Sequence, residues 1–354
     1  MSVFRDKLIS IDFSKNKGRI FYFLIIIAFF LSLIMSTLVG PVSIPLKYVV
    51  ESFLYQAGYH DLSIPAKYYE IVTILREPEI IGAAAVGASL AVGGAVIQSI
   101  FRNPISEPYI TGVSSGATFG AVVVIVFGFY FFGPYSLQIS AFTFSLLTVG
   151  VVYIMSMRNG RSPPVLMLLT GIAISLFMTS IVALLLYSNP NIENEVFFWL
   201  LGSLQGISWK EDTIVVPLVI ISSLFLFSMS KELNALQMGE DHAKSVGVSV
   251  EKTKAMAIII STVSVSAVVS ISGLIGFVGL IFPHVSRLLF GGSNKNVIPA
   301  SAILGATFLI LSNDLAHSIV YGEVIPIGII TGIIGVPFFM LLMMKISNRG
   351  YYDS

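Results

Sequence analysis

The chain has 354 residues, of which 55% are hydrophobic and only 11% are charged. A soluble domain usually carries about 25% charged residues, so a water-soluble core cannot hide this much apolar surface and lipid must cover the outside. The net charge of +1 at pH 7 argues against nucleic acid as a partner, and the absence of cysteine excludes disulfides and thiolate-bound metals.

Ten apolar runs are long enough to cross a bilayer, since a spanning helix needs about 20 mostly apolar residues. The first follows a basic, polar segment over 1–19 and is too long for a signal peptide, so we expect a retained span. The seventh and eighth runs meet at Ser272–Gly273, so one of the two could be broken or re-entrant. The runs are 20–39, 80–100, 110–132, 137–156, 164–187, 213–230, 255–272, 274–291, 297–319 and 327–345.

The distribution of Lys and Arg predicts the orientation, because these residues concentrate in cytoplasmic loops. With the N-terminus inside, 16 of the 20 fall in inner segments, and the outer four are Lys47, Lys67, Arg76 and Lys210. We therefore expect an all-α polytopic membrane protein with both termini in the cytoplasm. It should form a single transmembrane domain over 1–354, with the segment 1–19 cytoplasmic. The inner loop 231–254 is predicted to form a helix, a glycine and a short helix.

Small residues form a continuous face on the second run. Ala83, Gly87, Ala91 and Ala95 recur at four-residue spacing, so they lie on one side of a helix and allow neighbours to approach closely. Glycines and prolines cluster in the eighth and tenth runs, and broken helices are tolerated at mid-membrane only beside protein or an aqueous cavity. The candidates for lining a pathway are Gly276, Gly279, Pro283, Gly332, Gly335 and Pro337.

No catalytic or energy-converting motif occurs in the sequence. There is no GxxxxGK[ST] phosphate loop, no HExxH or GxSxG motif, and no carboxylate at the middle of a predicted span. The first absence indicates that ATP does not bind by that route, and the last is evidence against coupling to an ion gradient. We interpret the chain as a transporter without an enzyme active site. An ion-coupled secondary transporter and a membrane receptor or scaffold are the alternatives.

Six stretches carry a more specific signal. They are Leu75–Pro78; Arg102–Pro108 followed by Gly112–Ala117; Leu200–Ser203 with Trp209; Ala235–Glu240 with Ala243 and Val246–Val248; Gly276–His284 with Arg287; and Ile325–Gly328 with Thr331, Gly335 and Pro337–Phe339. In order and spacing over residues 75–345 they resemble the FecCD-type permeases of ATP-driven importers for iron–siderophore complexes, haem and cobalamin.

The resemblance implies a homodimer in the cell membrane with one translocation path at its interface. It also implies two copies of a cytoplasmic ATP-binding subunit and one extracytoplasmic substrate-binding protein. No cofactor and no metal site are expected in the chain itself. The contact that couples the permease to the ATPase is expected at Leu236, Met238, Gly239, Glu240, Ala243, Gly247 and Val248.

The resemblance also assigns roles at both membrane surfaces. Asn103, Pro104 and Pro108 should form a structural turn on the inner side, and Arg76 should dock the binding protein on the outer side. Where the family commonly has further arginines, this chain has Glu79 and, by alignment, His317, so the binding protein should present a different charge pattern. Siderophore, haem and cobalamin permeases share these motifs, so the cargo stays open; ferric siderophore is the commonest class.

Overall fold

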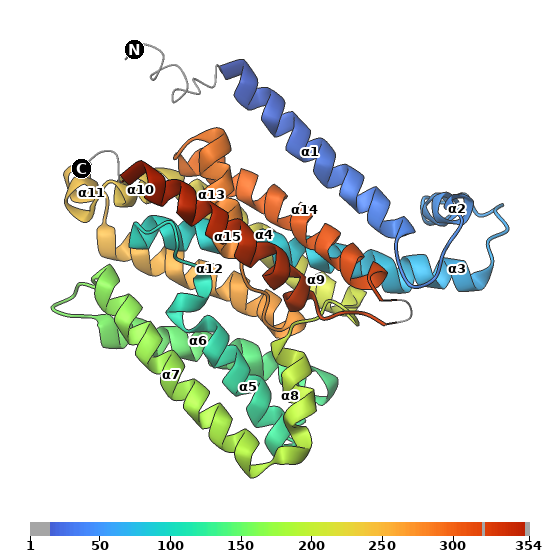
Figure 1. The fold of residues 1–354 in the computed structure, drawn as a ribbon, viewed down its shortest axis with the longest axis horizontal. Helices are drawn as coiled ribbons and strands as arrows, with labels where there is room; N and C mark the ends of the chain where they lie inside the picture. The colour runs from blue at the N-terminus through green and yellow to red at the C-terminus, as the bar shows by residue number, and fades with distance from the viewer. Residues whose placement is uncertain (1–14, 321–322, 351–354) are drawn as a thin grey trace.

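The computed structural model describes residues 15–320 and 323–350, and these form a bundle of helices (Figure 1). The predicted all-α class is therefore confirmed, while most of the basic segment 1–19 lies outside the described residues. The α-helices are α1 (Lys15–Leu38), α2 (Leu46–Gln56), α3 (Ala66–Glu70), α4 (Glu77–Phe101), α5 (Val113–Phe127), α6 (Ser136–Ser156), α7 (Pro164–Ser188), α8 (Glu193–Leu200), α9 (Trp209–Ser228), α10 (Ser230–Gln237), α11 (Glu240–Ser245), α12 (Val250–Ser272), α13 (Val278–Phe290), α14 (Asn294–Ser318) and α15 (Ile327–Gly350). A π-helical turn, η2 (Ile71–Arg76), precedes α4, and η3 (Pro108–Thr111), η4 (Gly133–Tyr135) and η5 (Pro190–Ile192) are short 3₁₀ helices.

Seven helical stretches among the described residues are long and apolar enough to cross a membrane, and three shorter apolar helices, α5, α13 and α15, lie at the remaining predicted runs. Glycines set the length of α5, because Gly112 and Gly128 adopt positive φ at its two ends. The non-helical segment 273–277 separates α12 from α13, which is a wider break than the sequence suggested. The number of crossings remains a prediction.

The second span begins earlier than predicted. Residues Ala66–Phe101 run as one helical stretch through α3, η2 and α4, whereas the sequence placed the start at residue 80. Pro78 lies inside this stretch, and a proline inside a helix clashes with the carbonyl four residues earlier. The wider π-helical turn directly before α4 accommodates this proline. The predicted start was therefore wrong.

The predicted small-residue face on α4 is buried against neighbouring helices. Ala83, Ala91 and Ala95 are fully buried, and a Cβ added to Gly87 would overlap the carbonyl oxygen of Gly305 on α14. Contacts of α4 with α12, α13 and α14 make it the centre of the main core. The small residues therefore serve close helix packing, as expected.

The two ends of the bundle carry different segments (Figure 1). The end we call the knob end holds the start of α1, the α6–α7 connection, α10 and α11. The opposite end holds α2, α3 and α8. This division matches the predicted inner and outer segments, although the side of the membrane that each end faces stays a prediction.

Candidate coupling site

The knob consists of α10, α11 and the residues up to Val248. Gly239 separates the two helices with φ 124° and ψ 151°, a conformation that L side chains rarely adopt. At the other end of α11, Val248 N donates to Ala243 O at 2.9 Å and Gly247 N donates to Lys244 O at 3.0 Å. With Gly247 at φ 84°, this is a Schellman motif. The predicted helix–glycine–short helix is confirmed, and glycine turns fix both ends of α11.

The knob has a buried side and an exposed side. Leu236 and Ala243 are 3% and 0% exposed, and they hold the knob against the bundle. Met238 and Val246, on either side of α11, are 71% and 57% exposed. Of the residues predicted to couple, Leu236, Gly239 and Ala243 thus shape the knob, whereas Met238 and Gly247 lie on its surface.

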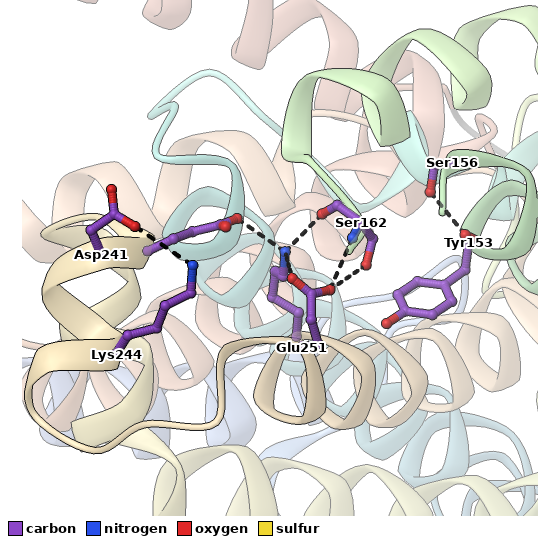
Figure 2. Close-up of polar contacts among 8 residues, drawn as sticks. Tyr153, Ser156, Ser162, Asp241, Lys244 and Glu251 are labelled. Atoms are coloured by element: carbon purple, nitrogen blue, oxygen red, sulfur yellow. Dashed lines mark hydrogen bonds and ion pairs between the residues drawn. The ribbon is translucent and has the colours of Figure 1, made fainter. Parts of the chain in front are cut away.

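A cluster of charged groups lies behind α11 (Figure 2). The side chain of Lys254, near the start of α12, is 1% exposed. Its Nζ donates to Glu240 Oε1 at 3.0 Å, to Ser162 O at 2.7 Å and contacts Glu251 Oε1 at 2.8 Å. An ammonium group has three donors, and here each has an acceptor. Helix α11, helix α12 and the α6–α7 connection therefore meet at one buried cation.

Glu251 completes this cluster from the other side. Its Oε2 accepts from the backbone N of Ser162 at 2.9 Å and from Ser162 Oγ at 2.7 Å (Figure 2). Sequence reasoning missed this arrangement. Glu251 and Lys254 are one helical turn apart, which predicts a local pair, but Ser162 lies 92 residues before Lys254 and no pattern links them.

The α6–α7 connection is itself a tight turn. Arg158 N donates to Arg161 O at 2.7 Å, and Arg161 N donates to Arg158 O at 2.9 Å. Asn159 and Gly160 between them have φ 50° and 73°, as a two-residue type I′ turn requires. Ser162 follows directly and is fully buried. The turn is therefore held by its own backbone hydrogen bonds, and the contacts with Lys254 and Glu251 add to them.

The predicted structural turn between α4 and α5 lies beside the knob. Ile105 N donates to Asn103 Oδ1 at 3.1 Å and Ser106 N donates to Asn103 O at 3.1 Å, while Pro108 starts η3. Pro104 lies exposed within this turn. A Cβ on Gly239 would come within 3.7 Å of Arg102 Nη1, so the turn and the knob are neighbours.

Burial around η3 also affects an acid in this turn. It raises the pKa of Glu107, because the charged carboxylate loses water. Tyr109, two residues on, exchanges hydrogen bonds with the backbone of Ile275: its OH donates to Ile275 O at 3.0 Å and accepts from Ile275 N at 3.2 Å. The turn is therefore attached to the break between α12 and α13.

At the opposite end, each residue expected to dock a binding protein contacts a group of this chain. Arg76 is 7% exposed and donates to Thr37 O at 2.7 Å and to Val42 O. Glu79 Oε1 lies 2.6 Å from His317 Nε2, and both side chains are 12% exposed. These groups line a cavity of about 400 Å³. Docking through them stays a prediction, and this conformation does not present Arg76 to a partner.

The glycines and prolines predicted to line a pathway do not share one environment. A Cβ on Gly279 would meet Leu90 O at 2.8 Å, and one on Gly335 would meet the Phe277 ring at 2.6 Å, so both are packing positions. Gly276 and Gly332 have open space around them. Pro283 is buried within α13 and Pro337 is exposed on α15. Pathway lining remains a prediction for this set.

Comparisons with known proteins give one consistent result. The model of the FecCD transport family matches residues 24–345. The cobalamin import system permease protein of Halobacterium salinarum is 37% identical over 79% of this chain and 75% of its own length. The iron(3+)-hydroxamate import system permease protein of Bacillus subtilis is 30% identical over 92% of this chain and 95% of its own.

A solved structure is similar as well. It is an inward-facing conformation of a metal-chelate type ABC transporter, 32% identical, with a TM-score of 0.80 over 91% of this chain and 98% of that chain. The likeness therefore covers both sequence and fold across almost the whole molecule.

Proposed function

The chain belongs to the FecCD transport family, and we propose that two copies of it form the path along which a metal chelate crosses the cell membrane. It is a multi-pass membrane protein and the permease subunit of an ATP-binding-cassette importer. In this family the ATP-binding subunit is a separate chain, so the permease must receive its driving force through a contact. A conformational change needs a difference in binding free energy between two states.

The knob is the observation that supports this contact most directly. A short helix with a glycine turn at each end presents Met238 and Val246 outward from a buried base of Leu236 and Ala243. A rigid, exposed element of this kind can fill a groove on a partner and move as a body with it. We propose that the groove belongs to the ATP-binding subunit, with one copy on each permease chain, and that the knob end faces the cytoplasm.

The homodimer is proposed on the family membership and on the surface of the described helices. Large apolar side chains on α7 and α15, among them Leu176, Phe177, Ile333 and Leu341, are 62–66% exposed. Lipid or a second chain must cover them. We expect the permease to be a stable dimer in nanodiscs. A monodisperse monomer that still supports reconstituted transport would contradict this.

The cargo class is proposed from two of the relatives, since another similar permease, from Haemophilus influenzae, is named for molybdate. The names of the two similar permeases specify cobalamin and iron(3+)-hydroxamate, both metal chelates with an organic shell. We propose a chelate of this size class, a ferric siderophore, haem or cobalamin, delivered by a substrate-binding protein at the opposite end of the bundle.

Reconstitution tests the proposal. Proteoliposomes containing the permease and its ATP-binding subunit, given binding protein loaded with ferric hydroxamate, haemin or cobalamin, should accumulate one of the three only when ATP is supplied on the knob side. Molybdate serves as a contrasting cargo without an organic shell. Uptake driven by a proton or sodium gradient in the absence of the ATP-binding subunit would overturn the proposal in favour of a secondary transporter.

A further inference from the structure

The buried cation behind the knob cannot contact a partner protein, because the side chain of Lys254 is 1% exposed. Its three acceptors belong to three different elements: Glu240 to α11, Glu251 to α12 and Ser162 to the α6–α7 turn. Glu240, whose side chain is 24% exposed, is turned toward this cation. Any contribution of Glu240 to coupling is therefore made through its contact with Lys254 inside the chain, and other residues of the knob make the contact with a partner.

Stability alone does not account for such a group. Burying an ammonium costs desolvation free energy that its ion pairs only partly return, and an apolar residue of similar size is often at least as stabilising. What the cation supplies is a fixed geometry among three separate elements. An apolar side chain would leave Ser162 O and Glu240 without a common partner, and the knob could then move independently of the turn.

The connection continues beyond Ser162 without a flexible joint. Both backbone groups of Ser162 are held by α12, its N by Glu251 and its O by Lys254. Two prolines, Pro163 and Pro164, follow directly and lead into α7, and the fixed φ of proline stiffens this link. On the other side of Ser162 lies the backbone-bonded turn from Arg158 to Arg161. A displacement of α11 therefore has a continuous rigid route to the start of α7.

We propose that Lys254 is the positioning residue that transmits movement of the knob to the α6–α7 turn and so to α7. This inference rests on the proposed function, because it assumes that the ATP-binding subunit moves the knob. Lys254 acts through Glu240 and Ser162 and touches neither the ATP-binding subunit nor the cargo. Its loss should separate ATP hydrolysis from import, while leaving the two subunits attached.

The test compares three variants in the reconstituted complex. Lys254→Met removes the cation and keeps most of the apolar stem; Glu240→Ala cuts only the link to α11; Glu240→Gln keeps an oxygen that Lys254 can still donate to. Mutations within such networks change coupling by about 2- to 30-fold. We expect cargo imported per ATP hydrolysed to fall about tenfold in Lys254→Met and Glu240→Ala and to be largely restored in Glu240→Gln, with affinity for the ATP-binding subunit within about twofold of wild type.

A matched control is the same substitution at Lys252, which is exposed two residues away on α12; Lys252→Met should retain the wild-type ratio. If Lys254→Met does not fold, Glu240→Ala decides, because it leaves the Lys254–Glu251–Ser162 contacts in place. An unchanged ratio of import to hydrolysis in a folded Lys254→Met, or in Glu240→Ala, overturns the inference. Loss of subunit affinity in parallel with import also overturns it. Absence of ATP-driven import in the wild type would instead overturn the proposed function.

A structural readout uses the chain's own trypsin sites. Arg158 and Arg161 are exposed in the turn, and the bond after Arg161 leads into fully buried Ser162. We expect cleavage at this turn to accelerate in Lys254→Met, which releases Ser162 O, and to stay at the wild-type rate in Glu240→Ala and Lys252→Met. Equal cleavage rates in Lys254→Met and wild type would show that Lys254 does not hold the turn.

Discussion

The knob end and the opposite end of the molecule use the same kinds of charged residue in different ways. At the knob end, the cation of Lys254 is buried behind α11 while Met238 and Val246 project outward. At the opposite end, buried Arg76 donates to backbone carbonyls of this chain and Glu79 pairs with His317, around a cavity. The Lys254 network lies behind an exposed surface, whereas the groups around Arg76 and Glu79 contact only other groups of this chain.

This difference bears on how each end meets a partner. A partner contact at the knob would need no rearrangement, because its outward residues are already exposed and its base is already packed. Arg76 would have to leave two carbonyl acceptors before it could meet an acidic group on a binding protein. The following predictions, ordered by the size of the expected effect, test whether the two ends differ in this way.

The largest effect is expected from Arg76→Glu. The change removes the donor for Thr37 O and Val42 O and adds a carboxylate to a cavity that already holds Glu79 and Asp314. Removing one partner from a buried charged cluster costs about 3–5 kcal/mol. The free energy of unfolding of the permease alone, measured in nanodiscs, should fall by that amount. Lys67→Glu, at an exposed position on α3, should change it little.

The alternative for Arg76 is a docking role, and the same variant distinguishes it. If Arg76→Glu leaves the permease as stable as wild type but weakens association with the binding protein more than tenfold, the guanidinium must be available to a partner, and the contrast between the two ends would fail. A tenfold change corresponds to about 1.4 kcal/mol.

Gly239→Pro tests the knob end. Proline fixes φ near −65°, whereas Gly239 has φ 124°, so the turn between α10 and α11 cannot be retained. We expect a local cost of about 3 kcal/mol, with loss of ATP-binding-subunit association and ATP-driven uptake. Gly292→Ala, at an exposed glycine between α13 and α14 with open space around it, is the control. Normal uptake by Gly239→Pro would remove the knob from the coupling role.

The sequence predicts those features that depend on neighbours in the chain. Apolar runs of membrane length, the small-residue face centred on Gly87 and the glycine turns around α11 all follow from local composition and spacing. The π-helical turn before Pro78 was not predicted. The clash of the proline ring with the preceding turn can be avoided either by a π-helical turn or by starting the helix at the proline, and the sequence does not distinguish the two.

Contacts between distant segments were not predictable in this way. Arg76 was identified from a motif, but nothing in the motif states whether its side chain points outward or toward Thr37 O. Likewise, the sequence shows Lys254 only as one cation of a charged loop, and its contact with Ser162 is visible only in the structure. The candidate site was therefore located from the sequence, whereas the direction in which its charged side chains act required the structure.

A smaller effect is expected from Glu79→Gln at the opposite end. The substitution removes the charge that faces His317 at 2.6 Å, but Gln can still accept from Asn313, whose Nδ2 lies 3.0 Å from Glu79 Oε1. A hydrogen bond to a charged group contributes about 1.5–3 kcal/mol, and the retained acceptor limits the loss to the lower part of that range. Thermal unfolding should show the change, while exposed Glu70→Gln should not. Equal shifts for the two variants would mean that the Glu79–His317 contact contributes nothing.

The smallest effect on stability is expected from Met238→Ala, which tests whether the exposed side of the knob is a contact surface. Met238 is 71% exposed, so truncation should leave the stability of the permease unchanged. If the side chain fills a groove on the ATP-binding subunit, its loss removes burial of about two methylene equivalents, at about 0.8 kcal/mol each. Subunit affinity should then fall about 5- to 30-fold. Met157→Ala, at a 44% exposed methionine beside the α6–α7 turn, should leave affinity unchanged because it lies outside the knob. If both substitutions weaken association equally, the contact extends over the whole knob end, and the distinction between a protruding contact and a buried transmitting network no longer holds.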